Sequence, residues 1–221
     1  MKRKLVVTAD GSHSFYLEEM DEHYHSKHGS IAESNHIFIE AGLKQKSAEK
    51  SNFKLLEVGM GTALNVWLSA LALKGSGLKV NYTAIEAFPL SLDEAQNLNY
   101  PDLLGKGHAL FNKIHQSEWE LPVQLTEEIS LLKQQASLQS LSLEQAYDLV
   151  YFDAFAPEKQ PELWEESIFR KLYDSMTKGG LLVTYCVKGV IRRRLKAIGF
   201  EVEKLAGPPG GKREMLRARK V

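Results

Sequence analysis

Hydrophobic and polar positions follow two alternating periods along most of this 221-residue chain. Short runs of apolar and β-branched residues, typical of buried strands, are separated by segments in which apolar residues recur every three or four positions, as in amphipathic helices. We expect strands at 53–58, 79–86, 128–133, 147–153, 180–187, 200–205 and 212–219, and helices at 30–43, 62–74, 89–98, 137–146, 162–176 and 189–198. This alternation predicts a parallel sheet with helices on both of its faces.

Both ends of the chain depart from the alternating pattern. The first 16 residues alternate like a hairpin that turns at Asp10 and Gly11, whereas the last two strands are joined by the Gly- and Pro-rich segment 207–211 without a helix. Those two strands must therefore pair antiparallel. Between the expected elements, Gly42 is a candidate helix stop, 44–52 reads as a polar connector, and 108–127 gives no clear pattern.

Composition limits the class of protein. Apolar residues make up 43% of the chain and charged residues 25%, as in ordinary globular proteins. No apolar run approaches the roughly 20 residues that span a bilayer, and the N-terminal apolar stretch is too short for a signal peptide, so we expect no membrane association. The single cysteine, Cys186, lies in an apolar run, which favours a packed thiol and a reducing, cytoplasmic location.

Charge is balanced in total but not along the sequence. Residues 188–221 contain eleven basic and three acidic residues, a net charge of +8 against −8 for the remainder. Such asymmetry can mark a phosphate-binding face on a neutral protein. A solvated surface compensated by the acidic remainder is the alternative, and composition alone leaves both open.

The segment around two glycines is the strongest chemical signal. Glu57 ends an apolar run, Gly59 and Gly61 follow, and an amphipathic segment begins at once. A strand, a tight glycine turn and a helix N-terminus in this order favour polar or anionic ligand groups. Glu86 ends the next expected strand, well placed for a ribose diol. The pattern predicts a nucleoside-bearing cofactor, against the alternative of a glycine turn needed only for steric reasons.

The spacing of this motif distinguishes between cofactors. Leu64 stands where a dinucleotide fingerprint needs glycine or alanine, which argues against NAD. The E-x-G-x-G-x-A form from Glu57 to Ala63 is closer to the first motif of S-adenosylmethionine-dependent methyltransferases. Asp153 ends a further strand, before a loop that contains a proline. We expect its carboxylate to point into the same cavity, although an aspartate here can also serve only as a cap or turn former.

Several motifs in a fixed order resemble one family, the methyltransferase half of the MnmC enzymes, which complete 5-methylaminomethyl-2-thiouridine at the tRNA wobble position. The matching segments are 24–34, 57–63 with Asn65, 86–90, 153–159 with Trp164, and 210–215. The resemblance implies a Rossmann-like class I methyltransferase: an α/β fold with a mostly parallel seven-stranded sheet and an antiparallel C-terminal hairpin. It also implies an N-terminal hairpin and lid at 1–52 and a methyltransferase domain at 53–221. The family's flavin-dependent oxidase half has no counterpart here, so we expect a stand-alone enzyme that uses S-adenosylmethionine and no FAD.

The resemblance also implies site residues. The expected cofactor-binding residues are Glu57, Gly59, Met60, Gly61, Thr62, Asn65, Glu86, Ala87, Gln135 and Asp153. The expected substrate-binding residues are Tyr24, Ser26, Glu33, Phe155, Pro157, Lys212 and Arg213. One departure concerns the adenine ring: the acidic residue that many methyltransferases place after the third strand is missing, and a glutamine, Gln135, is the candidate in its place.

The implied chemistry is methyl transfer to an amine. Asp153 is the expected catalytic residue, which accepts a hydrogen bond from the amine and orients its lone pair. Phe155 is expected to stack on the extruded base, and the basic C-terminal region to hold phosphates of the anticodon stem-loop of tRNA.

Three other interpretations have weaker support. Four histidines within 23–36 suggest a metal site, but no cysteine accompanies them and their spacing matches no zinc pattern, so we expect no metal. Methyl or aminopropyl transfer to a small amine, as in spermidine synthase, would favour an acidic pocket over a basic C-terminal face. A non-catalytic binding protein is disfavoured because Glu57, Glu86 and Asp153 are all present.

Overall fold

The computed structural model describes residues 2–143, 146–208, 211 and 213–221. Its strands are β1 (Arg3–Val7), β2 (His13–Leu17), β3 (Glu22–His23), β4 (Asn52–Val58), β5 (Lys79–Ile85), β6 (Pro122–Gln124), β7 (Ile129–Gln134), β8 (Tyr147–Phe152), β9 (Met176–Thr184), β10 (Phe200–Ala206) and β11 (Glu214–Lys220). Its helices are α1 (Ser30–Ser34), η1 (Asn35–Leu43), α2 (Lys44–Glu49), α3 (Leu64–Leu73), α4 (Leu92–Gln96), α5 (Tyr100–Leu104), α6 (His108–Gln116), η2 (Pro161–Trp164), α7 (Glu166–Ser175) and α8 (Gly189–Ile198).

The main sheet confirms the expected architecture. Within the described residues it has eight strands in the order β10-β11-β9-β8-β4-β5-β7-β6. The central strands β9, β8, β4, β5 and β7 pair in parallel, while β11 runs antiparallel to both β9 and β10. All seven predicted strands are present, and β6 adds an eighth, antiparallel to β7 at the edge. Because the chain crosses from β7 to β8, strand order reverses beside β4, where such sheets bind ligands.

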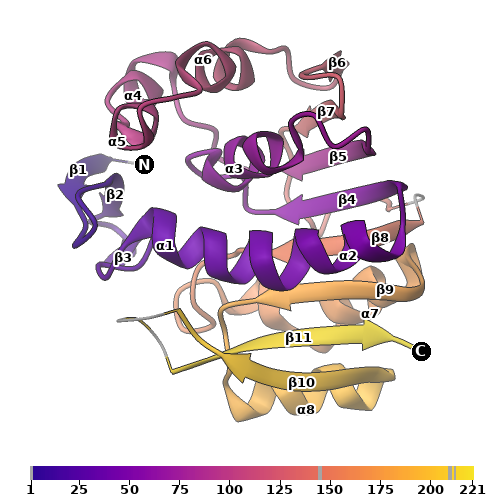
Figure 1. The fold of residues 1–221 in the computed structure, drawn as a ribbon. Helices are drawn as coiled ribbons and strands as arrows, with labels where there is room; N and C mark the ends of the chain where they lie inside the picture. The colour runs from indigo at the N-terminus through magenta and orange to yellow at the C-terminus, as the bar shows by residue number, and fades with distance from the viewer. Residues whose placement is uncertain (1, 144–145, 209–210, 212) are drawn as a thin grey trace.

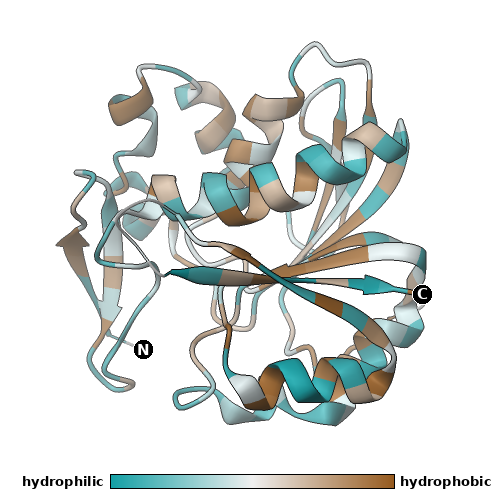
Figure 2. Ribbon diagram, turned by 60° about the horizontal axis from the view of Figure 1, so that its bottom comes forward, coloured by the Kyte–Doolittle hydropathy of each residue, from teal (hydrophilic) through white to brown (hydrophobic). Residues whose placement is uncertain are grey.

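Helices cover both faces of the sheet, so the protein has two hydrophobic cores. The helix from 30 to 49 and α3 lie on one face, and α7 and α8 lie on the other (Figure 1). Adjacent residues of one strand serve different cores: Leu55 packs with Phe38 and Trp67, whereas Leu56 packs with Phe169. The central strands are therefore hydrophobic on both sides, and the polar positions of the helices face outward (Figure 2).

The first long helix extends further than the sequence predicts. It runs from Ser30 to Glu49 with a π-helical middle, η1, so Gly42 is not its stop and 44–49 is not a connector. A Cβ at Gly42 would lie 3.1 Å from Val183 Cγ2 and 3.2 Å from Tyr151 Cε1. The glycine is therefore required for close packing of the helix on β8 and β9, a reason that the local sequence does not reveal.

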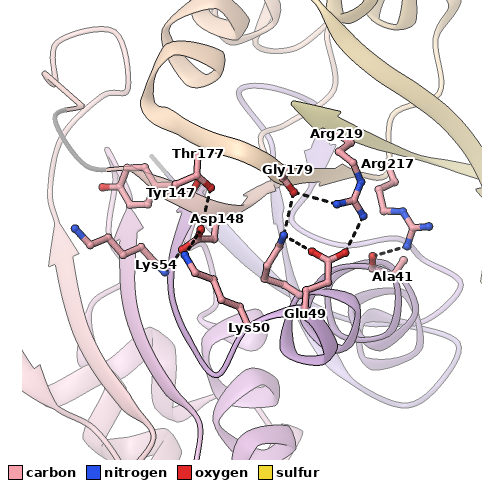
Figure 3. Close-up of polar contacts among 11 residues, drawn as sticks. Ala41, Glu49, Lys50, Lys54, Tyr147, Asp148, Thr177, Gly179, Arg217 and Arg219 are labelled. Carbon is pink, nitrogen blue, oxygen red and sulfur yellow. Dashed lines mark hydrogen bonds and ion pairs between the residues drawn. The ribbon is translucent and has the colours of Figure 1, made fainter. Parts of the chain in front are cut away.

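Polar contacts attach the C-terminal end of this helix to the sheet (Figure 3). The ammonium of Lys46, which is 4% exposed, donates to Glu49 Oε2 at 2.6 Å and to the carbonyl of Gly179 at 3.0 Å. The buried Asp148 carboxylate accepts from Lys50 Nζ and Thr177 Oγ1, both at 2.8 Å. The lysine-rich sequence of 44–52 predicts a solvated connector, but in the structure Lys46 and Lys50 pair with groups of the fold.

The helix expected at 137–146 is wrong for its described part, which forms turns and irregular structure at 137–143. The Lys171 ammonium donates to the carbonyls of Leu138, Gln139 and Leu141 at 2.8–2.9 Å. These carbonyls are therefore satisfied by a distant side chain and need no helical hydrogen bonds. Residues 144 and 145 lie outside the described residues.

The segment 108–127, which gave no clear pattern, contains α6 and β6. Phe111 and Ile114 of α6 are buried against α3, but the hydrophobic stripe is too short to stand out among polar neighbours. The helix expected at 89–98 is instead a shorter α4, capped by Ser91, and it is followed by α5.

The N-terminal hairpin is confirmed by the antiparallel pair β1 and β2, which β3 extends to a small three-stranded sheet. This sheet lies beside the carboxyl ends of the parallel strands (Figure 1). Phe15 of β2 and Phe38 of η1 belong to the same core as β4, so segment 1–52 shares packing with the main sheet. Among the described residues, no helix combines the length and the apolar character needed to cross a bilayer.

Replacing Gly42 with leucine should lower the free energy of unfolding by about 1–3 kcal/mol, because the new side chain overpacks the contact with Val183 and Tyr151. Urea unfolding measures the change. Ala48→Leu on the exposed side of α2 is the matched control and should shift stability by less than about 0.5 kcal/mol. Equal effects of both substitutions would show that Gly42 is not required for packing.

Candidate active site

A cavity of about 570 Å³ opens at the carboxyl ends of the parallel strands. Its floor is the turn after β4 together with the ends of β5 and β8, and the segment from β3 to α1 forms a wall. The loop at 136–139 and the segment 153–156 complete the lining. Both the volume and the position beside the reversal of strand order are typical of small-molecule sites.

The glycine turn is shaped by contacts within the protein. Gly59 has φ +87°, and a Cβ there would lie 2.4 Å from the carbonyl oxygen of Asp153. Gly61 has φ +51°, and its Cβ would lie 3.1 Å from the Tyr24 ring. Both glycines are therefore needed to hold neighbouring segments together at the cavity, so a bulky substitution would disturb the site before it blocked any ligand.

One amide group joins two carboxylates below the cavity. Asn65 Nδ2 donates to Glu57 Oε1 and to Asp153 Oδ2, each at 2.9 Å. Tyr82 donates to the other oxygen of Glu57 at 2.9 Å. The end of β4, the first turn of α3 and the end of β8 are thereby fixed to one another. Asn65 Oδ1 is buried and has no hydrogen-bond partner among the described residues.

Glu57 itself is fully buried beneath the lining. Burial raises the pKa of its carboxyl well above the usual range. The nearby carboxylates of Asp153 and Glu86 act in the same direction, while the hydrogen bonds from Asn65 and Tyr82 oppose the increase. Burial thus disfavours the charged form of Glu57 and favours the neutral acid.

Glu86 closes the turn from the neighbouring strand. Its carboxylate accepts from the backbone N–H of Gly61 at 2.9 Å and from that of Phe88 at 2.8 Å. These two hydrogen bonds orient the carboxylate at the cavity edge, where the sequence places it.

Arg3 holds one aromatic wall of the cavity. Its Nε donates to Tyr24 Oη at 2.9 Å, its Nη1 pairs with Glu94 at 3.0 Å, and its Nη2 donates to the carbonyl of Phe88. The Tyr24 ring meets Phe155 edge to face, with 5.2 Å between the ring centroids. Two aromatic rings from distant segments therefore face the same space.

The histidines between 23 and 36 contact different groups: His23 packs against the Tyr16 ring, whereas the His36 ring contacts the carbonyl of Ala206. No group of three potential ligands that could hold a metal is found in the described part of the chain. His25 lies at the cavity between Ser14 Oγ at 3.1 Å and Thr62 Oγ1 at 3.4 Å. Burial lowers the pKa of His25 to about 4, so it is a neutral part of the wall near pH 7.

Comparison with known proteins gives the family. A family model described as S-adenosyl-L-methionine-dependent methyltransferase matches residues 106–221. The chain belongs to the S-adenosyl-L-methionine-dependent methyltransferases. The matched residues include Asp153 but not the glycine turn, which precedes residue 106. The family model therefore supports the Asp153 side of the cavity, and the structure alone supports the glycine turn.

Two relatives extend the similarity over nearly the whole chain. The tRNA 5-methylaminomethyl-2-thiouridine biosynthesis bifunctional protein MnmC of Methylobacillus flagellatus is 30% identical over 216 residues, which cover 92% of this chain and 33% of that protein. Its namesake in Cupriavidus metallidurans is 30% identical over 231 residues, which cover 97% and 33% respectively. The methyltransferase thus spans about a third of the length of these relatives.

Solved structures show the shared fold. MNMC2 from Aquifex aeolicus superposes with a TM-score of 0.81 at 24% identity, over 99% of this chain and 70% of that one. Spermidine synthase from Thermotoga maritima superposes with a TM-score of 0.55 at 12% identity, over 100% of this chain and 72% of that one.

The groups at the cavity of the methyltransferase suit the cofactor of its family. The ammonium and sulfonium groups of S-adenosylmethionine need acceptors, and the Asp153 carboxylate lies in the lining. A ribose needs an acceptor at the end of the second parallel strand, where Glu86 lies. These residues therefore fit S-adenosylmethionine on their own chemistry.

Most of the expected site residues line this cavity, and a few do not. Those in the lining are Tyr24, Ser26, Glu33, Gly59, Met60, Gly61, Thr62, Asn65, Glu86, Ala87, Asp153 and Phe155. Gln135, Pro157 and Arg213 are not in the lining, and Lys212, like Gly210 of the matching segment 210–215, lies outside the described residues. Gln135 is exposed, and its backbone N–H donates to Glu120.

Sequence reasoning missed two parts of the lining. Leu138 and Gln139 enter it from the segment expected to be helical, and Tyr185 enters it after β9. Tyr185 donates to the carbonyl of Ala154 at 2.8 Å. Its place just beyond a buried strand at the same sheet edge as Asp153 is the signal that could have indicated it.

Many of the basic C-terminal residues pair within the methyltransferase. Arg217 pairs with Glu203 at 2.6 Å and Arg219 with Glu49 at 2.9 Å, and both guanidinium groups also donate to backbone carbonyls (Figure 3). Lys204, Lys188 and Lys220 likewise contact internal acceptors. The compensated-surface interpretation holds for these residues. Arg192, Arg193, Lys196 and Arg213 have no ion pair within the described part of the chain.

Glu57→Gln should alter the pH dependence of stability. A folded-state pKa above the unfolded value means that the folded protein holds the extra proton, so the free energy of unfolding falls as pH rises above about 4.3. The glutamine variant keeps a neutral group there and should lack this decline, so it should gain stability relative to the parent near pH 8. Urea unfolding at several pH values measures it, with exposed Glu118→Gln as control. Parallel pH profiles for parent and Glu57→Gln would contradict a neutral Glu57.

Proposed function

We propose that the methyltransferase transfers a methyl group from S-adenosylmethionine to the 5-aminomethyl group of wobble (2-thio)uridine in tRNA, giving 5-methylaminomethyl-2-thiouridine. The observation that carries the proposal is the meeting of the glycine turn, Glu86 and Asp153 at one cavity of a chain that matches MnmC relatives over nine-tenths of its length. The transfer is redox-neutral and requires neither flavin nor metal. We infer a cytoplasmic site of action, because tRNA is modified there.

The cofactor half of the cavity is assigned to the floor. The turn from Gly59 to Thr62 and the Asn65 side chain would hold the methionine end, with neutral Glu57 as their anchor. Glu86 and Ala87 would contact the ribose. For adenine we assign the loop at 136–139, which lies in the lining, in preference to Gln135, which does not.

Asp153 is assigned to the reacting amine. S-adenosylmethionine supplies a methyl group activated by its sulfonium charge. Asn65 fixes one oxygen of Asp153 at the cavity, which leaves the carboxylate oriented to accept a hydrogen bond from the amine and direct its lone pair. Tyr24, Phe155 and Ser26 would contact the base and exclude water, because they line the same space.

The tRNA backbone is assigned to cations at one edge of the sheet. Arg213 directly precedes β11, whose start lies at the same sheet edge as the cavity because β11 runs antiparallel to β9, and Lys212 is its neighbour in sequence. Arg192 and Arg193 are in the first half of α8, which follows β9 at that edge. An anticodon stem-loop whose wobble base enters the cavity would lay its phosphates near this edge.

A direct assay tests the proposal. The purified methyltransferase and S-adenosylmethionine are incubated with tRNA that carries 5-aminomethyl-2-thiouridine, and the nucleosides are analysed by mass spectrometry. We expect a gain of one methyl group on that nucleoside and none on tRNA without the aminomethyl group. Failure to methylate this tRNA, with S-adenosylmethionine bound, would refute the proposal.

Asp153→Ala should lower the single-turnover rate of methyl transfer by about 10²–10⁴, the usual contribution of a positioned proton acceptor. Its effect on cofactor affinity, measured by calorimetry, should be smaller. Asp174→Ala, an exposed aspartate on α7, is the control and should leave both unchanged. A rate within about threefold of the parent would assign Asp153 to loop structure alone.

Neutralising Lys212 and Arg213 together should weaken tRNA binding and lower its salt dependence by about 0.7–0.9 of a log–log unit for each phosphate that the variant no longer neutralises. A salt titration of tRNA affinity measures this. The matched control neutralises Lys74 and Lys178, two exposed lysines at the opposite edge of the sheet. Equal slopes in the parent and the Lys212–Arg213 variant would remove this segment from the RNA interface.

Transfer to a small amine is the second candidate, and one observation favours it. Five carboxylates line the cavity, those of Glu22, Glu33, Glu86, Asp153 and Glu162, which is the acidic pocket that a small polyamine would require. The same lining also suits the aminomethyl group of a nucleoside. Methylation or aminopropylation of free amines, with no activity on tRNA, would favour this candidate, while cofactor binding without any transfer would favour a non-catalytic protein.

A further inference from the structure

The inner part of the cavity is a compartment for a positive charge. It lies between Asp153 after β8, Tyr185 after β9 and Glu33 on α1, with the rings of Tyr24 and Phe155 on its side. We call these five residues the amine compartment. Carboxylates beside aromatic rings are the usual surroundings of a bound ammonium group.

The charges of the lining agree with this description. Among the described lining residues, five carboxylates face one lysine, Lys27, which is exposed at the rim. Two of the three histidines in the lining add little positive charge near neutral pH, because burial lowers the pKa of His25 to about 4 and also lowers that of His23. A cavity with this balance attracts a cation and disfavours an anion.

The acidic side chains of the lining differ in their contacts and exposure. Glu86 is oriented by two backbone N–H groups toward the glycine turn, and Asp153 is joined to Asn65. Glu162 is exposed on η2 at the rim. Glu33 is half-buried, and its Oε2 accepts from the backbone N–H of Ser26 at 3.2 Å, so its carboxylate is held against the wall rather than free in solvent.

Tyr185 marks the place where the acidic groups converge. Burial raises the pKa of its phenol, and the charges of Asp153, Glu22 and Glu33 raise it further. Because its proton is donated to the carbonyl of Ala154, the phenol oxygen acts as a further acceptor in the compartment.

We propose that Glu33 recognises the protonated amine of the substrate and makes the enzyme select an amine over a neutral group of the same size. The proposal rests on the proposed function for the identity of the nucleoside but not for the charge of the group. Glu33 selects the charge when the ammonium binds; Asp153, held by Asn65, then takes the proton that the ammonium loses, which frees the nitrogen lone pair to attack the sulfonium methyl. Loss of Glu33 should therefore raise KM more than it lowers kcat, and loss of Asp153 should do the reverse.

The test compares two anticodon stem-loops that differ in one group, 5-aminomethyluridine and 5-hydroxymethyluridine. The parent should bind the amine about 10- to 100-fold more tightly, as expected for a hydrogen bond to a charged group. Glu33→Gln, which keeps the contact with Ser26 but removes the charge, should bind both equally and retain its affinity for S-adenosylmethionine. Glu166→Gln makes the same charge change on an exposed residue of α7 outside the lining and should keep the parent's preference.

Several results would overturn the proposal. They are a Glu33→Gln variant that still prefers the amine, a parent that binds both stem-loops equally, and equal effects of Glu33→Gln and Glu166→Gln. If Glu33→Gln does not fold, the parent alone decides: its preference should disappear as pH rises above the pKa of the substrate amine, and a preference that persists there contradicts recognition of charge. A parent that ignores both stem-loops but prefers benzylamine over benzyl alcohol would refute the tRNA function and retain the role of Glu33.

Discussion

The rest of the site depends on the bridge from Asn65 to Glu57 and Asp153. Parallel strands align the ends of β4 and β8, and this amide donates to a carboxylate at each of the two ends, at 2.9 Å in both cases. Two carboxylates this close to one another repel if both are charged, and burial of Glu57 relieves the repulsion by favouring its neutral form. Asp153 lies in the cavity lining, so the two acids joined by Asn65 differ in their exposure to the cavity.

The sequence predicts those parts of the protein in which local pattern and tertiary position agree. Glu86 and Asp153 end buried strands, and parallel pairing places such ends together whatever the surrounding loops do. Gly42 and the segment 137–143 were misread because distant partners decide their structure. Tyr151 and Val183 leave no space for a side chain at 42, and the Lys171 ammonium replaces helical hydrogen bonds at 138–141. No local window of sequence contains those partners.

Acidic residues line the cavity, whereas basic residues are concentrated in the C-terminal segment 188–221. The C-terminal segment is strongly basic, yet Arg217 and Arg219 are used within the fold (Figure 3), and the cavity itself is lined by carboxylates. The net charge of zero therefore conceals an acidic cavity and a basic C-terminal segment, which total composition alone does not reveal.

Arg3 has a consequence for how this protein can vary. Its guanidinium contacts Tyr24 of the cavity wall, Glu94 of the α4 cap and the carbonyl of Phe88 next to the Glu86 loop. A lysine has one ammonium group in place of this planar fork, so it could not make all of these contacts at once. Positions 3, 24 and 94 are far apart in sequence, but their side chains contact one another through Arg3. Among relatives with this cavity we therefore expect the three residues to vary together, so that Tyr24 is absent wherever the arginine is absent.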